Sequence, residues 1–550
     1  MLEKSRQLSN KIIYLIFFFY FLIGVFIYQD FGLGIEEHFQ RKLGFYWLTY
    51  FLDFTGFEHI KSIASQKFTD IKTLTPNITD IKTHFFYGII YDLFLAFIET
   101  IFEINGPAIF YFRHLSVFLI FFLSSILFYK ILKTRFNNPW ASIFGTTIYL
   151  LSPKIFGSSF FDGKDIFFLS ILSISLFFFT KCIKKTNLFN ITIFAIFAAL
   201  ATSSRIFGLI IPLSFFIIVI LQTLGSSSLK YLKIFSVFFI IYIIALFLHW
   251  PYMWQLNFET LNILDTFKIK TGFKVYFHGE FYNSTNLPQS YIPKLIFIET
   301  PIYIIFLFFF GFIYKIKRIF NRIISFENNG SSSNDFWRSN HELIDLYFFI
   351  NLIIVTMYYF SFNPNLWGGW RHFLFLNIFF SYFSSYSIFL INNFTIKKNY
   401  KNLFNAILFL FSLNLVYTLY KLHPYQSLFF NNLIKNENKI LYEIDTQSIS
   451  RSDALKFILK DGKKLKKIKV ASASFTPLED ARSIIEKDQW EKIIFLGTSN
   501  KDTADYIYSN HLYEVDININ KKYDIPKNFK LYKELNLDGI RIYSIFKKDS

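Results

Sequence analysis

Long apolar runs, separated by short polar segments, dominate the chain from residue 12 to residue 420. A membrane-spanning helix needs ~20 mainly apolar residues, with a range of ~17–25. The runs of this length lie at residues 12–28, 115–132, 139–155, 165–181, 190–204, 207–223, 232–250, 294–314, 345–361, 372–391 and 403–420. The pattern therefore predicts a mainly α, polytopic membrane protein of about eleven transmembrane helices.

Clusters of Lys and Arg separate several of these runs and predict the topology. They lie at residues 130–135, 181–185, 230–233, 315–322 and 397–401. Lys and Arg are enriched in cytoplasmic loops, so each cluster marks a cytoplasmic turn. The first run follows Lys4, Arg6 and Lys11 and has no small-residue cleavage site behind it, which predicts a retained helix with a cytoplasmic N-terminus. An odd number of spans then places the C-terminus outside.

Residues 85–103 are apolar but carry Asp92, Glu99 and Glu103, which a lipid core would penalise. We expect an amphipathic helix in the outer interface, because a spanning helix here would place every later basic loop outside. Residues 29–113 then form a first outer loop with interfacial helices, and residues 251–293 form a further outer loop.

From residue 423 to residue 550, apolar runs become short and alternate with charged stretches. The pattern predicts strands at 467–472 and 492–497, helices at 453–460, 478–487 and 503–510, and a terminal hairpin at 531–547. We therefore expect a membrane module over residues 1–422 and a small soluble α/β domain over residues 423–550 on the outer side.

Composition agrees with a membrane protein. Hydrophobic residues make up 53% of the 550 residues, mean hydropathy is +0.36 and charged residues are 17%, against ~25% in soluble domains. The 78 Phe residues accompany an abundance of Ile, Lys, Asn and Tyr, so AT-rich codon usage explains them better than an aromatic binding role. The net charge of +18 comes from Lys and Arg in turns and in the C-terminal segment, which favours membrane lipids and not nucleic acid as the partner.

Polar residues of other kinds gather at the predicted outer ends of the spans. They are Asp30, Glu36, Glu37, Asp162, Lys164, Asp165, Arg205, Arg371 and His372. Ionisable residues at membrane depth are expensive, so such a group indicates a functional site. A carboxylate can take the proton of an attacking hydroxyl, and cationic groups can stabilise a leaving phosphate. Together these residue types predict glycosyl transfer from a lipid phosphate.

Structural roles compete with this interpretation. Asp162 or Asp165 can cap the following helix, Arg205 can anchor a tight helical hairpin, and the acids of the first outer loop can simply be solvated. The Trp residues at 250, 254, 367 and 370 are typical of an interfacial aromatic belt. No phosphate-binding Gly-rich loop, dinucleotide fingerprint or zinc spacing is present in the sequence.

The order of short motifs resembles the GT-C membrane glycosyltransferases, in particular the protein O-mannosyltransferases (glycosyltransferase family 39) and the lipid A aminoarabinose transferases. The resemblance covers residues 12 to about 432. Its motifs are Ile35-Glu36-Glu37, Arg113-His-Leu-Ser, the basic turn at 129–135, Ser152-Pro153, Phe161-Asp162-Gly-Lys-Asp165, Ser203-Ser204-Arg205, Trp250-Pro-Tyr, Thr300-Pro301 and His423-Pro-Tyr-Gln-Ser-Leu-Phe-Phe-Asn431.

This resemblance implies an inverting glycosyltransferase of the bacterial inner membrane, mannosyltransferase-like, moving a sugar from a polyprenyl-phosphate donor to an envelope protein, lipid or glycan. The family's catalytic base is usually an Asp, and here Glu36 holds that position beside Glu37, with Asp30 as an alternative base. Asp162 or Asp165 would be the second acid. Donor phosphate would be bound by Arg205, with Lys164, Arg371, His372 and Arg113 as further candidates. Residues 251–293 would form a flexible loop over the site.

Some members of this superfamily use a divalent metal, but the sequence contains no ligand cluster that indicates one, so the cofactor stays unknown. Two other classes compete with the enzyme. A transporter or channel predicts polar or Gly/Pro-interrupted spans near mid-membrane and two related halves, and neither is visible in the sequence. A catalytically inactive GT-C-like scaffold is compatible with Glu in place of Asp.

Overall fold

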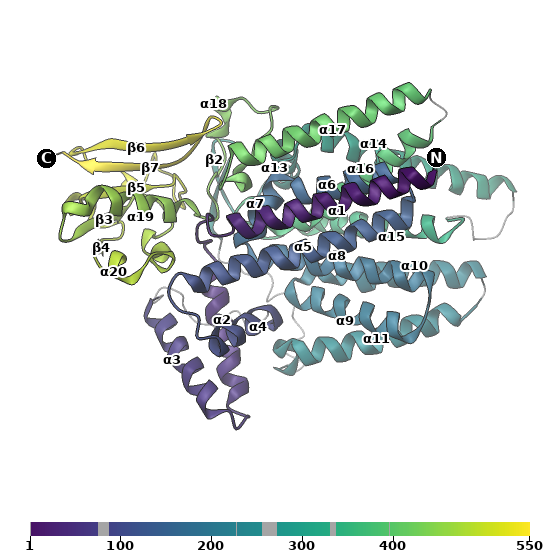
Figure 1. The fold of residues 1–550 in the computed structure, drawn as a ribbon, viewed down its shortest axis with the longest axis horizontal. Helices are drawn as coiled ribbons and strands as arrows, with labels where there is room; N and C mark the ends of the chain where they lie inside the picture. Colours follow the sequence, from purple (N-terminus) through teal and green to yellow (C-terminus); the bar gives the residue numbers. More distant parts are fainter. Residues whose placement is uncertain are drawn as a thin grey trace.

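The computed structural model describes residues 2–74, 87–226, 228–255, 272–329, 337–394 and 397–549. Long helices run side by side and form most of the molecule, and a small sheet domain lies at one end of them (Figure 1). The N-terminus lies at the other end of the helical part, far from the sheet domain (Figure 1).

All eleven predicted spans are helical. Within the described ranges, eight helices are long and apolar enough to cross a membrane. They are α1 (Leu2–Ile27), α5 (Ala108–Phe136), α8 (Gly163–Lys184), α10 (Ile210–Ser226), α11 (Lys230–His249), α15 (Asn340–Phe362), α16 (Asn377–Asn393) and α17 (Lys398–Lys421), where α10 and α16 are each extended by the preceding 3-10 turn. A ninth span arises if α13 (Tyr291–Glu299) and α14 (Ile302–Asn329), which are bent by 120°, are counted as one. The chain is thus a mainly helical integral membrane protein, as predicted.

The remaining two predicted spans are shorter than a full crossing. The segment at 190–204 is α9 (Leu188–Ser204), which has 17 residues. The segment at 139–155 is α6 (Pro139–Leu151), with 13 residues, and α7 (Pro153–Phe161) follows it directly. The helix is interrupted at Ser152, whose ψ of 115° is not helical, and Pro153 stands at the first position of α7, where a missing N–H is tolerated.

Burial separates the central helices from the lipid-facing ones. In α8 and α16 the apolar window is 83% and 89% buried, whereas in α1, α11 and α17 it is 22% buried. A helix that is apolar on all sides but mostly uncovered requires an apolar solvent. The outer three helices therefore form the lipid-facing rim around α8 and α16.

Small residues allow the closest helix contacts, as at Gly311 of α14. A Cβ at Gly311 would lie 2.2 Å from the carbonyl oxygen of Phe383 in α16, and that oxygen belongs to the rigid backbone. Close backbone approach through small residues is a common way to pack helices in lipid.

We therefore expect Gly311→Ala to destabilise the protein by about 1–3 kcal/mol, because the added methyl overpacks this contact. The measurement is the thermal midpoint in detergent, compared with Gly56→Ala, where the new Cβ meets nothing within 4 Å. Equal midpoints for the two variants would contradict the expectation.

Three helices of the predicted first outer loop lie beside one end of the bundle (Figure 1). They are α2 (Glu37–Leu52), α3 (Glu58–Leu74) and α4 (Ile90–Ile101), and α4 packs against both of the others. Glu99 of α4 is fully buried, and its carboxylate pairs with Arg41 at 2.6 Å and Lys67 at 3.7 Å. Its charge is neutralised inside the protein, which explains how an acid is tolerated in this apolar helix. Residues 75–86 of the predicted loop lie outside the described residues.

The C-terminal region forms a mixed sheet with helix α19 (Ser450–Asp461). The strand order is β4 (Ile493–Phe495), β3 (Ile468–Ser472), β5 (Tyr506–Ser509), β7 (Ile540–Lys548), β6 (Phe529–Leu537). Strands β3, β4 and β5 are parallel, and β7 is antiparallel to β5 and to β6. The small C-terminal α/β domain and its terminal hairpin are as predicted.

Two local predictions in this domain were wrong. Residues 503–510 are not a helix, because they contain the fully buried strand β5 in the centre of the sheet. Tyr506, Ile507 and Tyr508 are β-branched or aromatic residues that fit a pleated, two-sided core. Residues 478–487 form a 3-10 turn over Leu478–Ile484 instead of a full helix.

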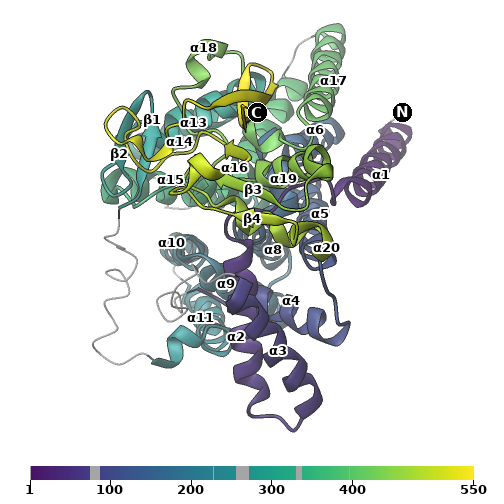
Figure 2. The same ribbon diagram turned by 90° about the vertical axis from the view of Figure 1, so that its left-hand side faces the viewer.

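A short ribbon from the predicted outer loop 251–293 lies against the C-terminal region. It consists of β1 (Lys274–Phe277) and β2 (Glu280–Asn283), and Phe277 forms a bridge with Tyr442. Residues 256–271 of the predicted loop 251–293 lie outside the described residues. Figure 2 views the molecule from this side, with the C-terminal sheet in front of the ends of the long helices.

Candidate active site

Glu36 connects three segments that are far apart in sequence. It occupies the N-cap position of α2, yet its side chain makes no capping hydrogen bond. Instead its carboxylate accepts a hydrogen bond from the Arg371 guanidinium and lies 3.9 Å from the Lys164 ammonium group. Glu36 therefore joins the start of α2 to the start of α8 and to the segment before α16.

Arg371 is directed into this cluster by a tight turn. Gly368 and Gly369 have φ angles of +72° and +71°, a region that favours glycine, and the 3-10 turn Arg371–Leu376 follows. The guanidinium carbon lies 3.8 Å from the centre of the Trp367 ring, in cation–π contact. The residues Trp367-Gly368-Gly369-Trp370 thus position the buried guanidinium of Arg371.

The start of α8 supplies a carboxylate on each side of Lys164. Asp162 caps this helix, since one carboxylate oxygen accepts the Asp165 N–H at 3.1 Å. The predicted capping role is therefore real, but the other oxygen, Oδ2, is buried and has no hydrogen-bond partner among the described residues. Asp165 forms a salt bridge with Arg205 at the end of α9.

The two acids respond differently to their surroundings. Burial would raise the pKa of Glu36, but the charges of Arg371 and Lys164 outweigh it and lower this pKa to about 2. Burial raises the pKa of Asp162 to about 6, where the charge of Arg371 opposes the rise and the like charge of Glu36 adds to it. The cluster therefore holds one carboxylate whose pKa is lowered and one whose pKa is raised.

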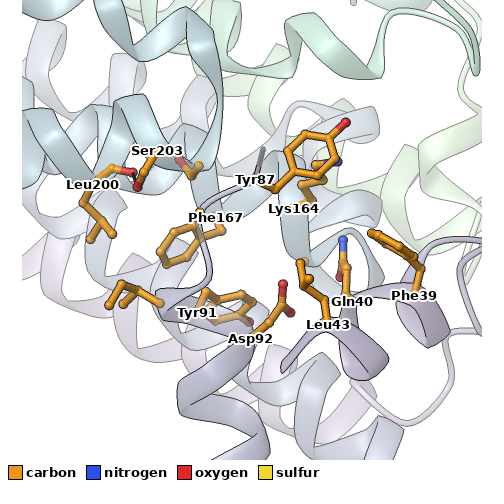
Figure 3. Close-up of a pocket in the computed structure, with 14 residues that line it drawn as sticks. Phe39, Gln40, Leu43, Tyr87, Tyr91, Asp92, Lys164, Phe167, Leu200 and Ser203 are labelled. Atoms are coloured by element: carbon orange, nitrogen blue, oxygen red, sulfur yellow. Dashed lines mark hydrogen bonds between the residues drawn. The ribbon is translucent and has the colours of Figure 1, made fainter. Parts of the chain in front are cut away.

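A small cavity opens beside Lys164 on the side of α4 (Figure 3). Its volume is about 30 Å³, enough for roughly one water molecule, and Gln40, Asp92 and Ser203 supply polar lining. Asp92 lies 3.7 Å from Arg113, and burial raises the pKa of its carboxyl to about 6. Arg113, which was predicted to bind phosphate, thus lies beside Asp92. The sequence analysis places Asp92 in an interfacial helix and gives it no role in the site.

Tyr87 and Trp367 were not predicted as site residues. The Lys164 ammonium group lies 3.2 Å from the centre of the Tyr87 ring, and Figure 3 shows the two side chains together. Such aromatic neighbours hold a cation without neutralising it. The Trp-rich motif was a usable signal for Trp367, whereas Tyr87 stands in a segment without a pattern.

Lys154, Glu299 and Trp370 form a second polar group that the sequence did not reveal. The Trp370 indole N–H donates to Glu299 at 2.8 Å, and Lys154 forms a salt bridge with the same carboxylate. Lys154 follows the Ser152-Pro153 motif, and Glu299 precedes Thr300-Pro301. The positions of these two motifs were therefore the signal in the sequence that could have indicated this polar group.

Three predicted site residues have other partners. Glu37 accepts the Gly34 N–H at 2.7 Å and lies 3.2 Å from His114, so it closes the turn before α2. Asp30 lies 3.0 Å from His423, and half of its side chain is exposed. The His372 ring lies edge-on to Trp367. Within the described ranges, no group of three or more His, Cys, Asp or Glu is arranged to hold a metal ion.

The chain was compared with known proteins. No protein-family model and no curated protein sequence matches it. Among solved structures it is similar to ArnT from Cupriavidus metallidurans in the apo state, with a TM-score of 0.45 and 9% identity over 98% of each chain. It is also similar to ArnT bound to undecaprenyl phosphate, with a TM-score of 0.42 and 9% identity over 96% of this chain and 97% of that one.

A further similar structure is the oligosaccharyltransferase of Archaeoglobus fulgidus, AglB, in the apo form, with a TM-score of 0.40 and 13% identity. The match covers 76% of this chain but only 57% of the AglB chain. ArnT and AglB belong to the group of GT-C glycosyltransferases that the sequence motifs resemble. With TM-scores of 0.40 to 0.45, the function of this protein rests on its own side chains.

Proposed function

We propose that the protein is an inverting glycosyltransferase that moves a sugar from a polyprenyl-phosphate donor to a hydroxyl group of an envelope acceptor. The observation that carries this proposal is the cluster of Glu36 and Asp162 with Lys164, Arg205 and Arg371 at one end of the helical bundle. Carboxylates for proton transfer and cations for a phosphate leaving group are what this reaction needs, at the depth where a lipid headgroup lies.

In the proposed reaction, the acceptor oxygen forms a bond to the anomeric carbon while the bond from that carbon to the phosphate oxygen breaks on the opposite face. The hydroxyl proton passes to Glu36, and the electron pair of the broken bond stays on the polyprenyl phosphate. Arg371, Lys164 and Arg205 stabilise the negative charge that develops there. The configuration of the sugar is inverted because a single displacement occurs.

The ion pairs of Glu36 fit a base that becomes active when the donor binds. Arg371 and Lys164 lower its pKa, and a phosphate that shares these cations weakens their hold on the carboxylate. Burial, which raises the pKa, then dominates and makes Glu36 a stronger base. Glu is one methylene longer than the Asp usual in the family, and its direct contact with Arg371 gives that length a use.

The sidedness of the site is proposed from charge. Lys133 donates to Asn10 near the N-terminus at 3.0 Å, and Lys184 contacts Thr134, so basic turns meet at the end of the bundle opposite the site. If that end is cytoplasmic, as the positive-inside tendency predicts, the site and the C-terminal domain face the outside of a bacterial inner membrane.

The direct test uses the purified protein in lipid vesicles with a radiolabelled polyprenyl-phosphate hexose and an envelope extract as acceptor. The expected result is release of polyprenyl phosphate together with label in the extract. Cells that lack the protein are expected to accumulate the sugar donor, which identifies the sugar by mass. If polyprenyl phosphate is not released and the sugar donor does not accumulate, the result favours the inactive scaffold instead.

The pH dependence of transfer follows from Asp162. The Asp162 carboxylate faces the charges of Arg371, Arg205 and Lys164, so its protonation disturbs the cations that bind the phosphate. Because kcat/KM reports groups of the free enzyme, and the pKa of Asp162 is raised to about 6, we expect kcat/KM to fall as the pH drops below about 6. In Asp162→Asn this decline should vanish between about pH 5 and 8, on a lower plateau. In Glu36→Gln the decline should move to lower pH, because the like charge that raises the pKa of Asp162 is gone. An unchanged acid limb in Asp162→Asn would contradict the assignment.

A further inference from the structure

The C-terminal domain contacts the backbone of the loop that presents Glu36. We call residues 32–36 the Glu36 loop. Within it, the Ile35 N–H donates to the carbonyl oxygen of Gln447 at 3.0 Å, and the Leu33 N–H donates to the Ser452 hydroxyl at 3.2 Å. These partners stand more than 400 residues away in the sequence, so the C-terminal domain supplies two of the hydrogen bonds of this loop.

The fit between the two parts leaves no room for a side chain at Gly32. A Cβ there would lie 1.9 Å from the carbonyl oxygen of Ile449. That oxygen belongs to the backbone just before α19, so it cannot move aside without shifting the helix. The Glu36 loop and the start of α19 are therefore packed backbone against backbone.

Arg451 lies at the centre of this contact. Its side chain is fully buried, and its guanidinium donates to the carbonyl oxygens of Leu33 at 3.3 Å, Ser448 at 2.9 Å and Pro477 at 2.9 Å, and to the Asp480 carboxylate at 3.2 Å. Burying a guanidinium is unfavourable unless its N–H groups form hydrogen bonds, and one of these hydrogen bonds is made to the Glu36 loop. A single side chain thus ties together α19, the turn at 477–480 and the loop.

The helix that follows Glu36 is tied to the same turn. His38 of α2 lies 2.7 Å from the carbonyl oxygen of Asp480, and its ring packs edge-on against Phe110. Contacts on both sides of Glu36, at Leu33 and Ile35 before it and at His38 after it, therefore lead to the C-terminal domain.

We propose that the C-terminal domain is a positioning element of the active site, in which Arg451 and Ser452 hold the Glu36 loop so that the Glu36 carboxylate meets Arg371 and Lys164. This proposal rests on the proposed function, in which Glu36 accepts the proton. Arg451 is a positioning residue and not a catalytic one, because it contacts the loop backbone and not the Glu36 carboxylate. The site is accordingly shared between the membrane bundle and the domain.

The test uses the full-length protein with Arg451→Ala, Arg451→Lys and Ser452→Ala. Asp461→Asn is the matched control, since the Asp461 contacts are Tyr506, Tyr532 and Lys547 of the sheet. Hydrogen exchange is expected to become faster at the amides of Leu33 and Ile35 in the first three variants and to stay unchanged there in the control. Arg451→Lys should lie between Arg451→Ala and the wild type, because Lys keeps the charge but not the planar fork.

A double-mutant cycle connects positioning with transfer. Arg451→Ala is expected to lower kcat on the order of 10²-fold, since a displacement of about 1 Å has that effect. In the Glu36→Gln background the same change should cost only a few-fold, because the residue being positioned is already inactive. An equal loss in both backgrounds, or unchanged exchange at Leu33 and Ile35, overturns the proposal. If Glu36→Gln alone keeps normal turnover, the proposed base is wrong, and the exchange data still decide whether the domain holds the loop.

Discussion

Replacing Glu36 by Gln is expected to lower the rate of sugar transfer by about 10²–10⁴-fold, the usual contribution of a general base. Gln keeps the size of the side chain and can still accept a hydrogen bond from Arg371, so donor binding should survive while proton transfer is lost. The measurement is kcat and KM for release of polyprenyl phosphate, where kcat falls and KM for the donor changes little.

Asp30→Asn is the matched comparison, because Asp30 is the alternative base of the first outer loop. Its partner is His423, and it is half exposed, so its replacement should leave the rate within a few-fold of the wild type. A large loss in Asp30→Asn together with normal transfer in Glu36→Gln would move the base to Asp30.

Among the described residues, the hydrophobic pattern was sufficient to predict each helix that is long and apolar enough to cross a membrane, because length and apolarity are local properties of the chain. It also placed Glu36, Asp162, Arg205 and Arg371 in one region, because the ends of antiparallel helices on one side of a membrane share one layer. The partners within that layer were not predictable. The pairs Asp165–Arg205 and Asp92–Arg113 depend on how the helices pack side by side, which single-sequence periodicity does not record.

In the C-terminal domain, two features could not be predicted from the sequence. Strand β5 was taken for a helix because four buried residues are too few to show a period. The contact of Arg451 with Leu33 had no signal at all, since 418 residues separate them and a charged side chain in a helical pattern is normally solvent-exposed. Hydrogen bonds between a side chain and a backbone carbonyl that is distant in the sequence cannot be predicted from a single sequence.

Asp345→Asn is expected to reduce the free energy of unfolding by about 3–5 kcal/mol, because it leaves a buried cation without its counter-charge. Asp345 does not cap α15, because the N-cap of that helix is Ser339. The Asp345 carboxylate instead accepts both donors of the Arg135 fork at 2.5 Å and the Tyr382 hydroxyl at 2.6 Å. This pair fastens α5, α15 and α16 together inside the bundle.

The measurement is the thermal midpoint of the protein in detergent, with Glu342→Gln as control. Glu342 stands one turn before Asp345 and pairs with Arg318 and Arg322 at a more exposed position, so its loss should cost less than the loss of Asp345. The double variant Arg135→Leu with Asp345→Leu should regain part of the stability, since it removes both charges of the pair, whereas the buried Lys315 near Asp345 stays in place. If the double variant is as unstable as Asp345→Asn, the cost comes from lost packing of the three helices and not from the unpaired charge of Arg135.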